Sequence, residues 1–195
     1  MRCMPYVGDR IPESLDGFSG LLVMGGPQSA HEPEVAPWVG ERALIASAVA
    51  ESRPFLGICL GAQLLAAACG GVVAPMTRPE RGVLAIDVRA EAEDDLWMRG
   101  LPRQVRVVQW HGDEVIALPP NSAWLASSAS CAHQAFRVGE RAWGLQFHPE
   151  ATPEILAGWA DADGEHAQKE VRQVAALDLA ATWRGAAERF ARLVI

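Results

Sequence analysis

The sequence has little cysteine and no block of like charge. Its four cysteines among 195 residues form no CxxC pair and no zinc-type spacing, so neither a metal centre nor a disulfide framework is predicted. Lys and Arg number 17 against 24 Asp and Glu, and the net charge of −7 argues against nucleic acid or an anionic membrane as a partner. No cofactor is expected, and unpaired thiols indicate a cytoplasmic protein.

A signal peptide and a convincing membrane span are also missing. The residues after Met1 turn polar at once, without the apolar stretch that precedes a cleavage site. Residues 54–77 carry no charge and are long enough to cross a bilayer, but several glycines, a glutamine and a proline interrupt them. We therefore expect a buried strand, a turn and a helix in this segment.

The composition is that of a globular protein. Hydrophobic residues make up 50% of the chain and charged residues 21%, which is enough apolar material for a sizeable core. The length suits one domain over residues 1–195. Within it we place the functional motifs in residues 20–153 and further helices in residues 153–195.

Strand and helix patterns alternate in the first third of the chain. Besides a strand at the extreme N-terminus, the apolar runs and helical periodicity predict a strand at 20–24, a helix at 37–52, a strand at 54–58 and a helix at 60–69. Such alternation is typical of parallel strands covered by helices. The fold class predicted is α/β, with three layers and a mixed, mainly parallel sheet that has helices on both faces.

The second half is richer in strands, joined by short turns that favour antiparallel pairs. The expected strands are 83–88, 104–110, 124–127, 132–138 and 141–147. Helices return after Pro153, and the last is amphipathic, with apolar residues stepping by four and three: Leu179, Trp183, Ala186, Phe190 and Leu193. Core packing is the expected role of this stripe.

Cys59 lies between an apolar strand and a helix, with Gly57 and Gly61 two residues to either side. This is the spacing of a nucleophile elbow, in which glycines accommodate a tight turn and the helix N-terminus favours the thiolate. The pattern is short, and by itself it fits a buried structural cysteine as well.

His148 and Glu150 follow the last predicted strand. In an extended chain residues i and i+2 point to the same side, so a histidine base and an orienting carboxylate can lie together. An ion pair on a surface turn is the alternative interpretation of these two residues in isolation.

A glycine loop at residues 25–26 follows the strand at 20–24. It lacks the Lys and Ser or Thr of a phosphate-binding loop and the GxGxxG spacing of a dinucleotide site. A backbone oxyanion donor remains, so the amide of Gly26, opposed by that of Leu60, is a candidate for stabilising a tetrahedral intermediate.

These pieces occur together and in one order: GGP, GICLGAQ, WHGD and GLQFHPE. In this the sequence resembles the class I glutamine amidotransferases of the Cys-His-Glu type, and in particular their free-standing GMP-synthase-like members. The resemblance implies a flavodoxin-like α/β fold and an enzyme that hydrolyses the side-chain amide of L-glutamine to glutamate and ammonia.

The resemblance also implies roles for single residues. Cys59 would be the nucleophile, His148 the base and acid, Glu150 its orienter, and Gly26 and Leu60 the oxyanion donors. Gln63 matches the family position whose side chain touches the substrate. Three more positions match the stretch that holds the α-amino-acid end of the substrate, largely through backbone: Trp110, Gly112 and Asp113. His111 is expected to have a structural or substrate-side role in a turn.

Two further expectations concern the whole protein. Family members begin with a strand and a helix of roughly 30 residues before the segment that aligns with Met1, so this unit is expected to be absent. No ammonia-accepting domain is recognisable either, which predicts a separate acceptor protein.

Two alternative functions stay open. A stand-alone γ-glutamyl hydrolase or peptidase would use the same triad on another γ-glutamyl compound. A catalytically silent binding module is the second alternative, although the cysteine, the histidine and the glutamate are all present.

Overall fold

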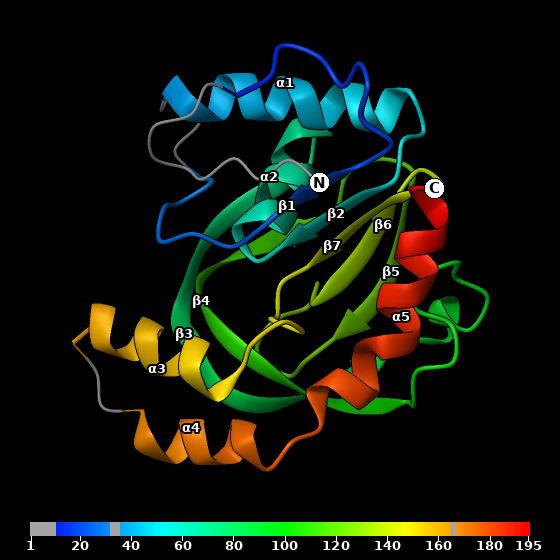
Figure 1. The fold of residues 1–195 in the computed structure, drawn as a ribbon. Helices are drawn as coiled ribbons and strands as arrows, with labels where there is room; N and C mark the ends of the chain where they lie inside the picture. Colours follow the sequence, from blue (N-terminus) through cyan, green and yellow to red (C-terminus); the bar gives the residue numbers. More distant parts are fainter. Residues whose placement is uncertain (1–10, 32–35, 165–166) are drawn as a thin grey trace.

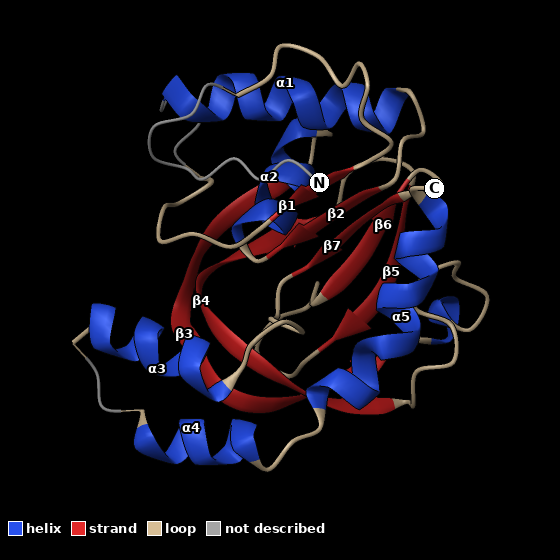
Figure 2. Cartoon of the chain, viewed as in Figure 1, coloured by secondary structure: helices blue, strands red, loops and turns tan. Residues whose placement is uncertain are grey.

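The described part of the chain builds one seven-stranded sheet (Figures 1 and 2). The structure is a computed structural model that describes residues 11–31, 36–164 and 167–195. In spatial order the strands are β1 (Leu21–Val23), β2 (Phe55–Ile58), β7 (Ala142–Leu145), β6 (Ala135–Val138), β5 (Ser122–Ser127), β3 (Val72–Val88) and β4 (Gln104–Ala117). The strand expected at the extreme N-terminus lies outside the described residues.

The sheet is mixed, as expected. β1 pairs with β2 and β2 with β7 in parallel, whereas the other four pairings are antiparallel. Fewer of the described strands pair in parallel than the sequence suggested. Short turns join strands in the second half of the chain, and strands joined in this way pair antiparallel.

Helices cover both faces of the sheet (Figure 2). They are α1 (Ala36–Ala50), α2 (Leu60–Ala68), the short 3-10 helix η1 (Ala90–Ala92), α3 (Pro153–Ala162), α4 (Gln168–Ala175) and α5 (Leu179–Leu193). In Figure 1, α1 and α2 lie on one side of the sheet and α5 on the other, while α3 and α4 lie beside the lower half of β3 and β4. The three-layer α/β class is thereby confirmed.

A separate hydrophobic core lies between the sheet and the helices on each of its two faces. Under α1 and α2, Ile45 and Leu64 are fully buried against the first sheet face. On the opposite face, Trp183 of α5 stacks on Trp97 with ring centroids 5.9 Å apart and contacts Phe147 at 5.1 Å. The amphipathic C-terminal stripe is therefore core packing, as predicted.

The strands β3 and β4 are longer than the sequence indicated. They pair along most of their length as an antiparallel ribbon, with an irregular register between Pro75 and Glu80. His111, Gly112 and Asp113 lie inside β4, so the expected turn at this motif is wrong. The physical reason is that prolines, a glycine and charges mask the strand pattern, while pairing with the neighbouring strand supplies the hydrogen bonds.

No helix among the described residues is long and apolar enough to cross a membrane. The uncharged segment 54–77 instead forms β2, α2 and the start of β3, as expected. One domain over residues 1–195 stays a prediction.

Replacing Trp183 by alanine should remove the aromatic contacts of α5 with Trp97 and Phe147. Because this side chain is 5% exposed and touches two other aromatic rings, we expect the free energy of unfolding to fall by about 3 to 5 kcal/mol. Urea denaturation followed by circular dichroism measures it. Ile116→Ala, at a side chain 52% exposed, is the control and should change stability by less than about 0.5 kcal/mol.

Candidate active site

Cys59 has a strained backbone at the junction of β2 and α2. It is the N-cap residue of α2, with φ 52° and ψ −107°, a conformation that residues with a side chain rarely adopt. A Cβ atom on Gly57 would lie 2.4 Å from the carbonyl oxygen of Gly61, and one on Gly61 would lie 2.2 Å from that of Val23. The glycine spacing is thus a steric requirement, and the predicted elbow is confirmed as a backbone geometry.

The thiol of Cys59 is directed away from its own helix. Its side chain makes no capping bond to α2 and is buried. The sulfur instead lies 4.0 Å from the backbone oxygen of Trp110 in β4 and 3.8 Å from Nε2 of Gln146, which follows β7. Groups from two distant segments therefore surround the sulfur.

His148 is held by its backbone and by its ring. Its amide donates to the carbonyl of Val108 in β4 at 2.8 Å, which fixes the chain after β7. Nδ1 donates to Oε1 of Glu150 at 2.7 Å, and the ring lies 4.4 Å from that of Trp159. Within the described residues the buried Nε2 has no partner at hydrogen-bond geometry, so it is free to exchange a proton with a neighbouring group.

The pKa of His148 reflects two opposed effects. Burial disfavours the charged imidazolium, but the adjoining Cys59 sulfur and the hydrogen bond with Glu150 favour it more strongly and raise the pKa to about 10. The ring can therefore hold a proton close to the sulfur. A thiolate paired with an imidazolium is the reactive form of a cysteine nucleophile.

The glycine loop passes directly over these two side chains. A Cβ atom on Gly25 would lie 3.0 Å from Cε1 of His148 and 3.4 Å from Cβ of Cys59, and one on Gly26 would lie 3.0 Å from the Leu60 side chain. Leu60 begins α2, where backbone amides lack partners within the helix. The two expected oxyanion donors thus lie on neighbouring segments.

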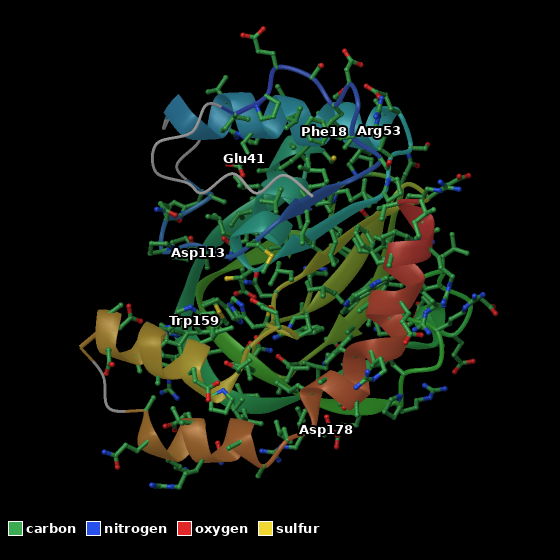
Figure 3. The ribbon with its side chains drawn as sticks, in the orientation of Figure 1. Phe18, Glu41, Arg53, Asp113, Trp159 and Asp178 are labelled. Carbon is green, nitrogen blue, oxygen red and sulfur yellow. The ribbon has the colours of Figure 1, made fainter. Side chains whose placement is uncertain are left out.

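A cavity of about 660 Å³ opens beside the sulfur. Its lining includes all the residues to which the sequence assigned a catalytic, oxyanion or substrate-binding role except Leu60: Gly26, Cys59, Gln63, Trp110, Gly112, Asp113, His148 and Glu150. Gln63 is buried and donates through Nε2 to the backbone oxygen of Asp113 at 3.2 Å. In Figure 3, Asp113 and Trp159 mark where β4 and α3 reach this cavity.

Sequence reasoning missed a charged pair in the cavity wall. Arg81 of β3 forms an ion pair with Asp163 at 2.7 Å, just past the end of α3, and stacks on the Trp110 ring at 4.4 Å. Trp110 also donates to Asp163 at 2.9 Å. Isolated charges of this kind have no local sequence signal, because only the long β3–β4 ribbon and α3 bring them together.

The glycine loop is also tied to β4. Ser29 donates to the Asp113 carboxylate, and Nδ1 of His31 lies 3.3 Å from the same oxygen. Asp113 therefore contributes its carboxylate to the loop in addition to its backbone oxygen, which accepts from Gln63. This contact too was not foreseen from the sequence.

A second buried network lies behind the cavity. His111 places Nε2 3.0 Å from Oε2 of Glu80 and Nδ1 2.9 Å from the backbone oxygen of Asp113. Ser128, Ser130 and Gln134 also donate to this carboxylate. Burial opposes its charge, but hydrogen bonds from His111 and the serines, with the charge of His111, lower the pKa of Glu80 to about 2. His111 thus lies in a strand rather than a turn and is bound to Glu80.

Two further described cysteines have no such surroundings. Burial raises the pKa of the Cys69 thiol, and burial together with the charges of Glu80 and Glu114 raises that of Cys131. Both are therefore poor nucleophiles. In the part of the chain that the structure describes, no cluster of three metal-ligating side chains occurs.

Comparison with known families gives one extended match. A family model described as "Glutamine amidotransferase class-I" matches residues 6–156. Among curated proteins, the GMP synthase [glutamine-hydrolyzing] of Porphyromonas gingivalis is 34% identical over 149 residues, which are 76% of this chain but 28% of that protein. The chain thus spans little more than a quarter of that relative.

Shorter relatives and solved structures are also similar. A putative glutamine amidotransferase-like protein of Salmonella typhimurium is 32% identical over 170 residues, 85% of this chain and 69% of that protein. The crystal structure of a glutamine amido transferase from Methylobacillus flagellatus superposes with a TM-score of 0.81 at 28% identity, covering 95% of this chain and 80% of that one.

The Glu80 network makes stability depend on pH in a defined direction. The pKa of Glu80 is lowered from 4.5 to about 2 on folding, so its contribution is complete above pH 4.5 and is lost as the pH falls towards 2. We expect Glu80→Gln to lower the free energy of unfolding by about 3 kcal/mol at pH 7, and the difference from the parent to shrink between pH 4.5 and 2.

Urea denaturation at pH 7, 4.5 and 3 measures this difference. Glu93→Gln is the control, because Glu93 forms an exposed ion pair with Arg103 at 3.3 Å, and it should cost less than about 0.5 kcal/mol. An equal loss of stability in both variants, or a difference that grows as the pH falls, would contradict the account of the network.

Proposed function

Because the chain belongs to the class I glutamine amidotransferases, which are cysteine-nucleophile hydrolases of the glutamine amide, we propose that it releases ammonia from L-glutamine with Cys59, His148 and Glu150. The observation that supports this most is the conjunction of a strained elbow cysteine with a histidine whose Nδ1 is bound by a carboxylate. This is the arrangement that acyl transfer by a thiol requires.

The first half of the reaction forms a thioester. The thiol proton passes to Nε2 of His148, and the Cys59 sulfur attacks the side-chain amide carbon of glutamine. The carbonyl electrons move to oxygen, where the backbone amides of Gly26 and Leu60 stabilise the negative charge. When the intermediate collapses, the carbon–nitrogen bond breaks and ammonia leaves with the proton from His148.

The second half returns the enzyme to its starting state. Water attacks the thioester carbon while His148 accepts a proton from it, and the carbon–sulfur bond breaks to give the new carboxyl group and the thiolate. His148 returns its proton to the thiolate, and the carboxyl group loses its proton to water, which leaves glutamate and the thiol. Glu150 keeps the ring in the tautomer that exposes Nε2 and stabilises its charged form.

The remaining cavity wall is assigned to the amino-acid end of the substrate. The residues that line it are Gln63, Trp110, Gly112 and Asp113, and the backbone oxygen of Trp110 faces the sulfur. A zwitterionic head group needs both donors and acceptors, which a strand edge and the Arg81–Asp163 pair supply.

We assign the ammonia to a separate synthase protein that binds this chain in the cytoplasm. The support is that one subunit of the GMP synthase [glutamine-hydrolyzing] of Pyrococcus abyssi is 41% identical over 118 residues, 57% of this chain and 61% of that protein. The acceptor's own chemistry is left open by this similarity, and neither a nucleic acid nor a membrane is assigned as a partner.

A second function is favoured by the size of the cavity. Its volume of about 660 Å³ lies in the range that holds drug-sized ligands, and a charged pair lines its wall. Such a site has room for a γ-glutamyl compound larger than glutamine. The same triad would then release an amine, as in a γ-glutamyl hydrolase or peptidase.

Purified protein should release ammonia and glutamate from L-glutamine in equal amounts. Cys59→Ala should lower kcat/KM by about a thousandfold or more, because no other group can form the thioester. Cys69→Ala is the matched control, since its thiol is half-buried at the other end of α2, and it should retain parental activity.

Measuring kcat/KM for L-glutamine and for a γ-glutamyl anilide distinguishes the two functions. A higher kcat/KM for glutamine supports the amidotransferase, and a higher value for the anilide supports the hydrolase. Turnover of neither substrate by folded parent protein, or full activity in Cys59→Ala, would contradict both.

A further inference from the structure

Gln146 is a buried amide in contact with the sulfur of Cys59. Ile58 at the end of β2 is paired with Leu145 at the end of β7, so the residues that follow, Cys59 and Gln146, emerge side by side. The amide of Cys59 donates to the carbonyl of Leu145 at 2.7 Å, which locks the two chain ends together. The Gln146 side chain, 1% exposed, then reaches Sγ through Nε2 at 3.8 Å.

The direction of this amide follows from its neighbours. The backbone oxygen of Asp113 can only accept, so the group that Gln63 turns towards it at 3.2 Å must be Nε2. The same Nε2 lies 3.3 Å from Gln146, which must therefore present its oxygen. Gln146 is left with its N–H directed at the sulfur.

The far end of this chain of bonds is anchored in the core. The backbone oxygen of Asp113 also faces Nδ1 of His111 at 2.9 Å, and Nε2 of the same ring faces the buried Glu80 carboxylate at 3.0 Å. A backbone carbonyl and a carboxylate can only accept hydrogen bonds. The donor and the acceptor of every hydrogen bond between Glu80 and Gln146 are therefore fixed.

We propose that Gln146 is a further catalytic residue, whose amide N–H donates to the Cys59 thiolate and keeps the sulfur in place for attack. A hydrogen bond to an anion is stronger than one to a neutral group, so this donor favours the thiolate over the thiol. Because Gln146 donates to the sulfur, the proton of His148 can be delivered to the departing ammonia. The inference rests on the proposed role of Cys59 as nucleophile.

The rate of alkylation of Cys59 by iodoacetamide, measured against pH by intact mass, tests this directly. Gln146→Met removes the donor and should move the midpoint of the rate profile up by about one pH unit, with about tenfold slower alkylation below it. Gln146→Glu has nearly the same shape but presents an anion to the sulfur, and its midpoint should rise further. Cys59→Ala supplies the background from the other thiols.

Gln109→Met is the matched control. Its side chain is also fully buried and donates to Gln134 at 2.8 Å, but it makes no contact with the sulfur, so the midpoint should stay where it is in the parent. Apart from the carboxylate added in Gln146→Glu and the thiol removed in Cys59→Ala, the titratable and charged side chains that face the cavity are the same in all these proteins: Arg81, His111, Asp113, His148, Glu150 and Asp163.

Each outcome decides the inference. A raised midpoint in both Gln146 variants, with none in Gln109→Met, supports it; if Gln146→Met does not fold, Gln146→Glu decides alone. An unchanged midpoint in a folded Gln146 variant overturns it even where the parent hydrolyses glutamine. A raised midpoint in a protein that hydrolyses neither substrate supports the hydrogen bond from Gln146 to the sulfur but refutes the proposed function and, with it, a catalytic role of Gln146. Absence of alkylation in the parent overturns both.

Discussion

The left-handed backbone at Cys59 is the constraint on which the rest of the site depends. With φ at 52°, the residue is lifted out of the sheet at the point where β2 becomes α2. This turn fits only because Gly57 and Gly61 let three backbone segments approach within distances that no Cβ atom tolerates. The tight packing of the parallel strands β1 and β2 against α2 maintains the strain.

The sheet order then brings the partners of the thiol to one place. Parallel strands direct their carboxyl ends to the same edge, so the glycine loop after β1, the elbow after β2 and His148 after β7 meet there. The antiparallel β3–β4 ribbon adds the opposite wall and holds His148 through the carbonyl of Val108. Neither part of the mixed sheet would make the cavity alone.

Much of this could be predicted from the sequence because it is encoded locally. The glycines around Cys59 are required by sterics within five residues, and His148 and Glu150 are two residues apart in an extended chain. The alternation of apolar runs and helical periods likewise reveals the α/β layers, and α5 has its apolar face in the register expected.

The remaining features depend on contacts between distant segments. The length of β3 and β4 is decided by their mutual pairing, which prolines and charges conceal in the sequence. Glu80 meets His111 only across that ribbon, and Arg81 meets Asp163 only where the end of α3 reaches β3. Gln146 belongs to the GLQFHPE motif, yet its contact with the sulfur follows from the register of β2 with β7.

The most direct test of the central claim is the intact mass of the protein after exposure to the glutamine analogue diazo-oxo-norleucine. A nucleophilic thiol beside a cavity that accepts a γ-glutamyl group should give one adduct on the parent chain and none on Cys59→Ala. Folded parent protein that remains unmodified, or a Cys59→Ala variant that is modified equally, would contradict the claim that Cys59 is the nucleophile of a glutamine site.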